Sequence, residues 1–201
     1  MNLAVFVSGR GSNLKAIIDN QELNSLINIK AVCSNDPNCN ALKIAESLAI
    51  DTYIVPKIQD EKAVSTIIDF LELREIELIV LAGYLKLIPE LLVNRFEEKI
   101  INIHPALLPA FGGKGMYGMN VHKAVFESSA KVSGATVHFV NQEYDKGKII
   151  AQRCVDISDV KSPEEIAKRV LQIEHKLLPF VIKKFAQNKI KIVDDRVVVL
   201  D

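Results

Sequence analysis

Short apolar runs alternate with stretches of helical periodicity through most of this 201-residue sequence. Each apolar run has the length of a strand and carries valine or isoleucine, which is typical of strands that are buried on both faces. Strands of this kind, separated by helices, predict a parallel sheet with helices on both faces. The expected strands are 3–7, 27–33, 52–55, 78–82 and 100–103, and the expected helices between them are 14–19, 41–49, 61–73 and 89–99.

The second half of the chain predicts a shorter helix, two strands, a long helix and a terminal hairpin. The long helix should begin with Ser162 as its N-cap, Pro163 at the first helical position and Glu165 placed to close a capping box. It should run towards Asn188, bent or broken near Pro179, because an interior proline removes a hydrogen bond and clashes with the preceding turn. The other expected elements are a helix at 121–128, strands at 134–140 and 149–157, and hairpin strands at 189–193 and 196–200.

These elements predict an α/β fold with a mostly parallel, twisted sheet and a C-terminal hairpin. We find no internal repeat, low-complexity tract or linker, and the length fits one domain over residues 1–201. Within it we distinguish an N-terminal half of about 1–100 and a C-terminal half of about 101–201. The composition, 49% hydrophobic and 25% charged, is ordinary for a packed globular protein.

Charge and cysteine content exclude several classes of protein. The chain has 25 Lys and Arg residues and 25 Asp and Glu residues, so its formal net charge is zero. It therefore has no excess positive charge that would favour binding to nucleic acid or to an anionic membrane. No apolar stretch approaches the ~20 residues that a bilayer needs, and the N-terminus lacks the pattern of a secretory leader. The three cysteines form no CxxC pair, which argues against a disulfide framework and a zinc ribbon. We expect a cytoplasmic protein without metal, nucleic-acid or membrane partners.

A glycine-rich segment joins the first expected strand to the first helix. Gly9 and Gly11 permit a tight turn, and Ser12 or Asn13 would cap the helix, whose N-terminus offers N–H groups and a positive dipole end to an anion. Leu14 stands where a dinucleotide fingerprint has its third glycine, and the Gly-Lys-Ser/Thr of a Walker loop is missing. The segment therefore favours a small phosphate ester slightly over a plain turn, and it argues against NAD or ATP.

A polar pair stands at the end of the fifth expected strand. Asn102 and His104 point the same way, because side chains alternate faces along a strand. The asparagine amide can donate to a developing oxyanion, and the histidine can give and take a proton near neutrality. The alternative is that both residues merely cap the strand. Asp145, in a turn before Gly147, would orient His104, raise its pKa or serve only the turn, and His138 would be a packing or supporting residue.

Taken together, four segments in this order resemble the phosphoribosylglycinamide formyltransferases. They are Ser-Gly-Arg-Gly-Ser-Asn-Leu at 8–14, Leu-Ala-Gly-Tyr at 81–84, Asn-Ile-His-Pro-Ala-Leu-Leu-Pro at 102–109, and Val-His-Phe-Val with Tyr-Asp-Lys-Gly within 137–147. The resemblance covers nearly the whole chain and implies a Rossmann-like formyltransferase fold. It also implies transfer of a formyl group from 10-formyltetrahydrofolate, the co-substrate, to the amine of glycinamide ribonucleotide in purine biosynthesis, by a monomer or homodimer.

The resemblance assigns roles to particular residues. Asn102, His104 and Asp145 match the catalytic group, in which Asn102 and protonated His104 would stabilise the oxyanion. Glu174 matches a glutamate that holds the ribose hydroxyls of the substrate. The N-terminal half would bind phosphate and the C-terminal half folate. The other matches are Gly11, Ser12 and Asn13 for the substrate phosphate, and Leu85, Lys86, Leu87, Ile88 and Asn102 for the folate.

The sequence departs from the family pattern at two places. Leu171 stands where a glutamine is often found, which brings one ribose contact into question. The stretch Phe111–Met119 is longer and richer in glycine than the usual family loop, and we interpret it as a candidate lid. Lys62 is a candidate for the basic residue near the glutamyl tail of the folate.

Other activities compete with this interpretation. Formyltetrahydrofolate hydrolase and methionyl-tRNA formyltransferase share the Asn-x-His-Pro block, but members with those activities carry an extra regulatory or RNA-binding module, for which we expect no room here. A zero net charge also suits tRNA poorly. A non-catalytic phosphate-ester or folate-binding module would have no use for Asn102 and His104 together.

Overall fold

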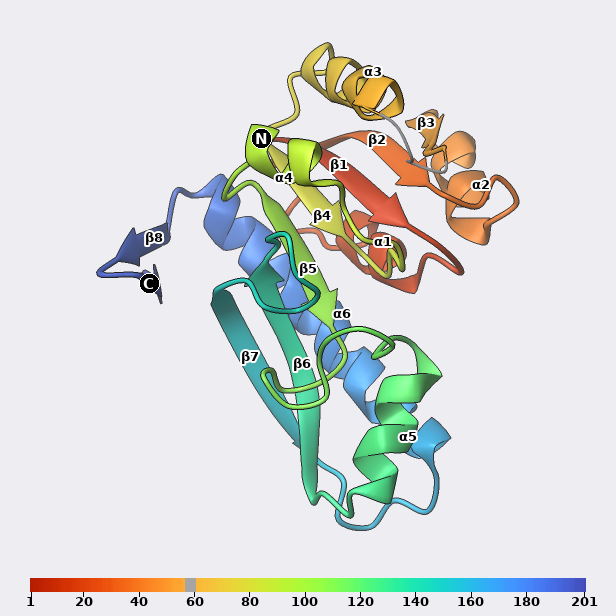
Figure 1. Ribbon diagram of the computed structural model, residues 1–201, viewed down its shortest axis with the longest axis vertical. Coiled ribbons are helices and arrows are strands. Elements are labelled where there is room, and N and C mark those ends of the chain that lie inside the picture. The colour runs from red at the N-terminus through yellow and green to blue at the C-terminus, as the bar shows by residue number, and fades with distance from the viewer. Residues whose placement is uncertain (57–60) are drawn as a thin grey trace. The chain divides into compact units, whose positions relative to one another are not determined.

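The computed structural model describes residues 1–56 and 61–201 (Figure 1). The chain forms two compact units, Met1–Ile101 and Asn102–Asp201. The boundary falls inside the strand β5 (Ile100–His104), so that Asn102 and His104 both belong to the second unit.

The first unit is built on parallel strands that hydrogen-bond in the order β3-β2-β1-β4. The central strand β1 is buried from Leu3 to Val7, as expected of a strand that is covered on both faces. The Ile79 amide donates to the carbonyl of Lys99 at 2.8 Å, which places the start of β5 beside β4. The strands are β1 (Asn2–Val7), β2 (Asn28–Ser34), β3 (Asp51–Ile54) and β4 (Leu78–Leu81).

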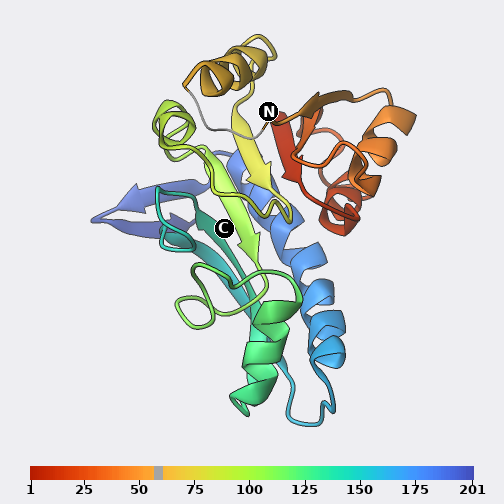
Figure 2. The same cartoon turned by 45° about the vertical axis from the view of Figure 1, so that its right-hand side comes forward.

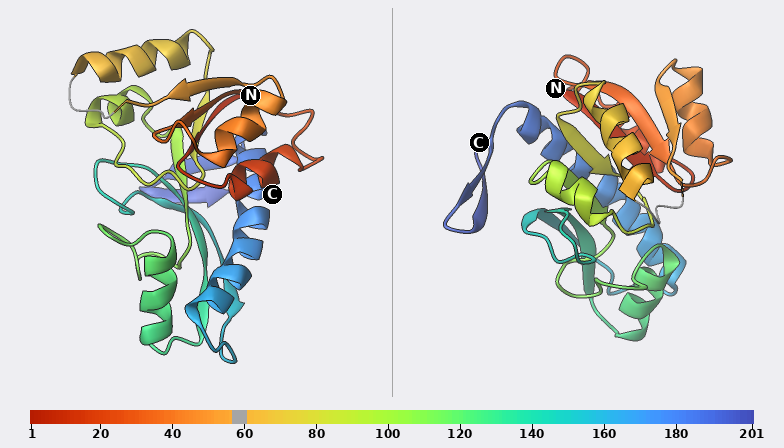
Figure 3. Two further views of the ribbon diagram at one scale, coloured as in Figure 1. Left: turned by 90° about the vertical axis from the view of Figure 1, so that its right-hand side faces the viewer. Right: turned by 45° about the horizontal axis from the view of Figure 1, so that its top comes forward.

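The helices of the first unit cover both faces of its sheet, as the sequence predicts. The chain moves from β1 through β2 to β3 and then returns to β4, and right-handed crossovers put the helices of the two directions on opposite faces. One face carries α1 and α2, and the other carries α3 and α4 (Figure 3). The helices are α1 (Ser12–Ile18), α2 (Asn40–Ser47), α3 (Glu61–Glu72) and α4 (Glu90–Arg95).

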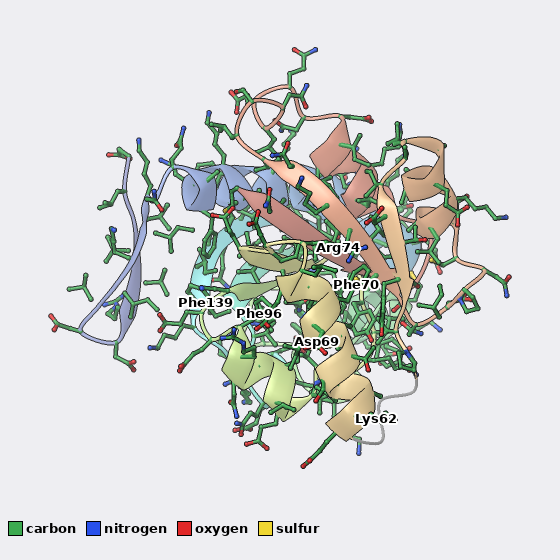
Figure 4. All side chains as sticks on the ribbon, turned by 90° about the horizontal axis from the view of Figure 1, so that it is seen from above. Lys62, Asp69, Phe70, Arg74, Phe96 and Phe139 are labelled. Atoms are coloured by element: carbon green, nitrogen blue, oxygen red, sulfur yellow. The ribbon has the colours of Figure 1, made fainter. Side chains whose placement is uncertain are left out.

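Arg74 ties the edge strand β3 to the end of α3. Its guanidinium contacts the Asp51 carboxylate at 2.7 Å and lies 3.7 Å from the centre of the Phe70 ring. Phe70 in turn packs against Tyr53 of β3, with ring centroids 4.5 Å apart. Figure 4 shows Phe70 and Arg74 near one end of α3 and Lys62 at the other.

The second unit combines two antiparallel strands with two helices and a hairpin. The long helix α6 packs against β6, β7 and α5 (Figure 2). The β6–β7 pairing shifts register between Val137 and His138, where β7 carries one extra residue, Ile150. The elements are α5 (Met119–Glu127), β6 (Val132–Phe139), β7 (Ile149–Asp156), α6 (Pro163–Ala186), β8 (Ile190–Val193) and β9 (Arg196–Val199).

Helix α6 begins as predicted but does not break. The hydroxyl of Ser162 accepts a hydrogen bond from the Glu165 amide at 3.3 Å, while the Glu165 carboxylate accepts from the Lys161 amide at 2.9 Å, one residue earlier than in a standard capping box. The helix continues through Pro179, so the predicted break is wrong. Buried apolar side chains flank the proline and outweigh its lost hydrogen bond; they are Leu177, Leu178, Val181 and Ile182.

All strands and helices predicted from the sequence are present. The largest difference is in the fourth helix, which was expected to reach residue 99 but ends at Arg95. Glu98 has a φ of 55°, a left-handed conformation that a continuing helix cannot contain. In the described part of the chain, no helix is long and apolar enough to cross a membrane.

Candidate active site

Asn102 and His104 lie at the end of β5, in the second unit. Ile103 between them is buried with the core, and His104 is only 3% exposed. Contacts to His138 and Asp145 bring both side chains into one polar cluster, as their spacing on a strand predicts.

Both ring nitrogens of His104 face a polar atom. Its Nε2 lies 2.9 Å from the carbonyl oxygen of Phe111, which can only accept, so Nε2 carries the proton. Its Nδ1 lies 3.5 Å from Oδ1 of Asp145 and is therefore the basic atom. Burial lowers the pKa of His104, helped by the nearby His138, while the Asp145 charge and the Phe111 carbonyl oppose this without overcoming it. As predicted, the Asp145 charge raises the pKa of His104, but the overall change is a decrease. The ring is therefore neutral at neutral pH.

Asp145 occupies the turn between β6 and β7, where its backbone adopts a left-handed φ of 56°. Its Oδ2 accepts a hydrogen bond from the Gly113 amide at 2.8 Å, and its Oδ1 lies 3.6 Å from Nε2 of His138. Burial alone would raise the pKa of Asp145, but its contacts with His138, His104 and the Gly113 amide lower the pKa overall. Asp145 is thus a carboxylate held beside a neutral histidine.

His138, predicted as a packing or supporting residue, contacts the polar cluster directly. It is 2% exposed, and its Nε2 lies 3.1 Å from Nδ2 of Asn102. Its Nδ1 lies 2.7 Å from the carbonyl oxygen of Phe139. One sequence signal points to such a role, because a histidine inside an otherwise apolar strand needs polar partners when it is buried.

The glycine-rich stretch that follows β5 contributes backbone groups that sequence reasoning missed. The Phe111 carbonyl contacts His104, and the Gly113 amide binds Asp145. A Cβ on Gly112 would lie 2.4 Å from Cδ2 of Leu108 and 3.1 Å from Cβ of Asp145. The stretch therefore packs closely against the carboxylate side chain, and main-chain atoms complete the site.

In the first unit, Gly11 is the N-cap of α1 with a left-handed φ of 79°. Ser12 and Asn13 lie inside the first turn, so the prediction that one of them caps the helix is wrong. A Cβ on Gly11 would approach Cβ of Ala41 to 2.8 Å, and the Ala41 amide donates to the Gly9 carbonyl at 3.2 Å. The loop is therefore seated against the start of α2, where only glycine fits at position 11.

The segment 85–88, expected to contact folate, follows β4 in the first unit and is bonded to the same loop. The Leu85 amide donates to the hydroxyl of Ser8 at 3.0 Å. Leu85 and Leu87 are each 46% exposed, whereas Ile88 is buried. Lys86 lies exposed between the two leucines. The segment presents apolar side chains on an anchored backbone.

Glu174 lies on α6 of the second unit and is 8% exposed, so it is not an exposed helix carboxylate. Leu171 lies one turn earlier on the same helix. Across residues 1–56 and 61–201, no group of three or more His, Cys, Asp or Glu side chains is placed to hold a metal ion.

Comparison with known proteins identifies the family of this chain. Residues 1–182 match the model of the formyl transferase family. The chain belongs to this family. It is 46% identical over 200 residues to the chloroplastic phosphoribosylglycinamide formyltransferase of Arabidopsis thaliana, a match that covers 97% of this chain and 68% of that protein. It is 40% identical over 185 residues to the phosphoribosylglycinamide formyltransferase of Bacillus subtilis, covering 90% of this chain and 92% of that protein.

The fold of this formyl transferase family member agrees with a solved structure. The crystal structure of phosphoribosylglycinamide formyltransferase from Anaplasma phagocytophilum matches with a TM-score of 0.90 at 35% identity, covering 100% of this chain and 95% of that chain. The α/β fold and the folate-dependent formyltransferase family predicted from the sequence are thereby confirmed.

Proposed function

We propose that this family member transfers the formyl group of 10-formyltetrahydrofolate to the amine of glycinamide ribonucleotide. The products are formylglycinamide ribonucleotide, an intermediate of purine biosynthesis, and tetrahydrofolate. The observation that carries the proposal is the buried cluster in which neutral His104 lies between the Asp145 carboxylate and the Phe111 carbonyl, with the Asn102 amide nearby. The similar relatives named phosphoribosylglycinamide formyltransferase support the choice of substrate.

In the proposed mechanism, the substrate amine attacks the formyl carbon and the formyl oxygen takes up negative charge. The Asn102 amide would donate to this oxyanion. His104 would take the amine proton at Nδ1, and the imidazolium so formed would be stabilised by Asp145 at 3.5 Å. His104 would then give the proton to the departing folate nitrogen. The protonated His104 expected from the sequence therefore arises during the reaction, because burial keeps the resting ring neutral.

For the ribonucleotide, we assign the phosphate to Gly11, Ser12 and Asn13 and the ribose hydroxyls to Glu174. The support for the first assignment is the left-handed Gly11 at the start of α1, since the first turn of a helix presents backbone N–H groups to an anion. The support for the second is a carboxylate, an acceptor of hydroxyl hydrogen bonds, on α6. The side chain of Leu171 has no polar group with which to contact the ribose.

For the folate, we assign the pterin ring to segment 85–88 and to Asn102. Leu85 and Leu87 are nearly half exposed and offer apolar surface that an aromatic ring would cover. The exposed Lys62, in the first turn of α3, stays a candidate for the glutamyl tail. The single-domain organisation, the oligomeric state of monomer or homodimer, and the cytoplasmic location also stay predictions.

The deciding experiment mixes purified protein with glycinamide ribonucleotide and 10-formyltetrahydrofolate and follows tetrahydrofolate release by absorbance. A parallel sample omits the ribonucleotide. Release that requires the ribonucleotide supports transfer, whereas release without it favours the hydrolase. Binding of either compound without release in either sample favours the non-catalytic binding module.

A further inference from the structure

His138 is the one histidine of the polar cluster that the mechanism above does not use. Its Nδ1 lies 2.7 Å from the carbonyl oxygen of Phe139, and its Nε2 lies 3.1 Å from Nδ2 of Asn102. A carbonyl oxygen only accepts and an amide nitrogen only donates. The contact with the Phe139 carbonyl therefore places a proton on Nδ1. In the neutral ring Nε2 then has a lone pair, which can accept a hydrogen bond from Asn102.

We propose that His138 is a positioning residue that fixes the orientation of the Asn102 amide for formyl transfer. An asparagine amide can turn over and exchange its oxygen and nitrogen, and only its surroundings decide between the two orientations. With a lone pair on Nε2 of His138, only the orientation that presents Nδ2 is favourable. One N–H of the amide is then used by His138, and the other stays free for the oxyanion. This inference rests on the proposed function.

A competing partner for Nε2 of His138 is Oδ1 of Asp145. That distance is 3.6 Å, beyond the range of a hydrogen bond, whereas the Asn102 nitrogen is at 3.1 Å. A proton on Nε2 would point towards the N–H of Asn102, and moving it there from Nδ1 would leave a lone pair facing the Phe139 carbonyl. The form protonated on Nδ1 alone satisfies both short contacts.

The carbonyl that selects this form is itself held in place by the backbone. The Phe139 amide donates to the Lys148 carbonyl at 2.9 Å. A Cβ on Gly147 would lie 1.8 Å from the Phe139 carbonyl oxygen, so the returning chain passes directly against it. The register shift between Val137 and His138 lies at the same place, and its extra residue, Ile150, is on the partner strand β7. The backbone thus fixes the Phe139 carbonyl that contacts Nδ1 of His138.

Two substitutions separate positioning from packing. His138→Asn keeps a donor near the position of Nδ1 and removes the acceptor at Nε2, whereas His138→Gln places an amide oxygen near Nε2. We expect His138→Asn to lower kcat by about 10- to 100-fold, less than the ~10²–10³ lost with an oxyanion donor itself, while KM for both substrates changes less than about threefold. His138→Gln should recover most of kcat. Equal kcat in the two folded variants, or wild-type kcat in His138→Asn, would overturn the proposal.

A double-mutant cycle tests whether His138 acts through Asn102. In an Asn102→Ala background, His138→Asn should cause no further loss of kcat, because the group that it orients is gone. The same fold loss in both backgrounds would show that His138 acts independently of Asn102, and the proposal would fail.

A measurement without turnover keeps this inference separate from the proposed function. Nitrogen NMR of ¹⁵N-histidine-labelled protein, with the His138 signals assigned from the His138→Gln variant, should show Nδ1 protonated and Nε2 unprotonated. The Nε2 signal should shift in Asn102→Ala. A proton on Nε2 would refute the positioning role whatever the enzyme does. Failure of ribonucleotide-dependent turnover in the wild type would refute the function, and the NMR result would still decide how the amide is held.

Discussion

The Nδ1 atom of His104 lies 3.5 Å from Oδ1 of Asp145, and both side chains are at most one-tenth exposed. Two opposing effects therefore act on the same imidazole. Burial disfavours the charged ring and lowers the pKa of His104, while the negative charge of Asp145 favours the charged ring and limits that decrease. Asp145 thus determines how far the basicity of His104 falls.

Replacing Asp145 with asparagine should move the acidic limb of the pH–rate profile to lower pH. The reaction needs neutral His104 as the base, so activity falls as the pH drops through its pKa. Without the Asp145 charge, less opposes the effect of burial, so the pKa of His104 falls further. The loss of activity then begins at a lower pH. Asparagine tolerates the left-handed φ of 56° at this position and can still accept from Gly113. The measurement is kcat/KM against pH, and an unmoved limb would leave Asp145 as a turn residue only.

Alanine at His104 or at Asn102 should give a folded but nearly inactive protein. Loss of a general acid–base group typically costs about 10²–10⁴ in rate, and loss of an oxyanion donor about 10²–10³. Steady-state kcat for each variant checks the effect, with circular dichroism as the control for folding. Normal turnover in either variant would contradict its assignment.

Gly11→Ala should weaken ribonucleotide binding, and Gly9→Ala is its matched control. A side chain at position 11 meets Cβ of Ala41 at 2.8 Å and forces an L-residue to adopt a φ of 79°, whereas a Cβ at position 9 meets nothing within 4 Å. Strain of this kind costs about 1–3 kcal/mol, and its relief should displace the loop. We expect KM for the ribonucleotide to rise at least about tenfold in Gly11→Ala but not in Gly9→Ala. KM for 10-formyltetrahydrofolate should change little in either variant. Equal KM values in both variants would argue against a phosphate role for the loop.

Gly147→Ala and Gly134→Ala should both destabilise the second unit, but they should differ in activity. Both would place a Cβ against a backbone carbonyl, at 1.8 Å from Phe139 in the first case and at 2.1 Å from Arg153 in the second. Overpacking of this kind typically costs about 1–3 kcal/mol of unfolding free energy. Only Gly147→Ala displaces the Phe139 carbonyl, which contacts His138. We therefore expect kcat to fall more in Gly147→Ala than in Gly134→Ala, even where the two variants are equally stable. Urea unfolding and kcat measured side by side test this, and equal kcat values would contradict it.

Local patterns in the sequence were sufficient to predict the elements, but not where contacts override them. The apolar run Leu3–Val7 predicts a doubly covered strand because burial on both faces requires that composition. The same approach predicts a bend or break at Pro179, since local patterns do not show the buried apolar side chains that flank the proline in α6. The cap of α1 was misassigned for a similar reason, because the fit of Gly11 against Ala41 comes from another helix.

The candidate site shows the same limit. Spacing alone puts Asn102 and His104 on one face, and an aspartate before a glycine indicates a turn. That this turn brings Asp145 to His104 depends on the β6–β7 hairpin, and the contribution of Phe111 and Gly113 comes from backbone atoms, which every residue possesses. A sequence carries no sign of which main-chain groups will be used.

Thr136→Val should cost more stability than its change in shape explains. The Thr136 hydroxyl donates to the Ala106 carbonyl at 2.6 Å and accepts from the Leu108 amide at 3.1 Å and from Nε2 of Gln152 at 2.9 Å. Valine keeps the volume but leaves buried polar groups without this partner, and each such group costs about 1–3 kcal/mol. Thr136→Ser is the matched control, because it keeps the hydroxyl and loses only a methyl group, at about 0.5–1.5 kcal/mol by analogy with Ile→Val. Urea unfolding of both variants should rank valine as the more destabilising, and the reverse order would show that packing of the methyl group, rather than the hydroxyl, holds the segment after His104 against β6.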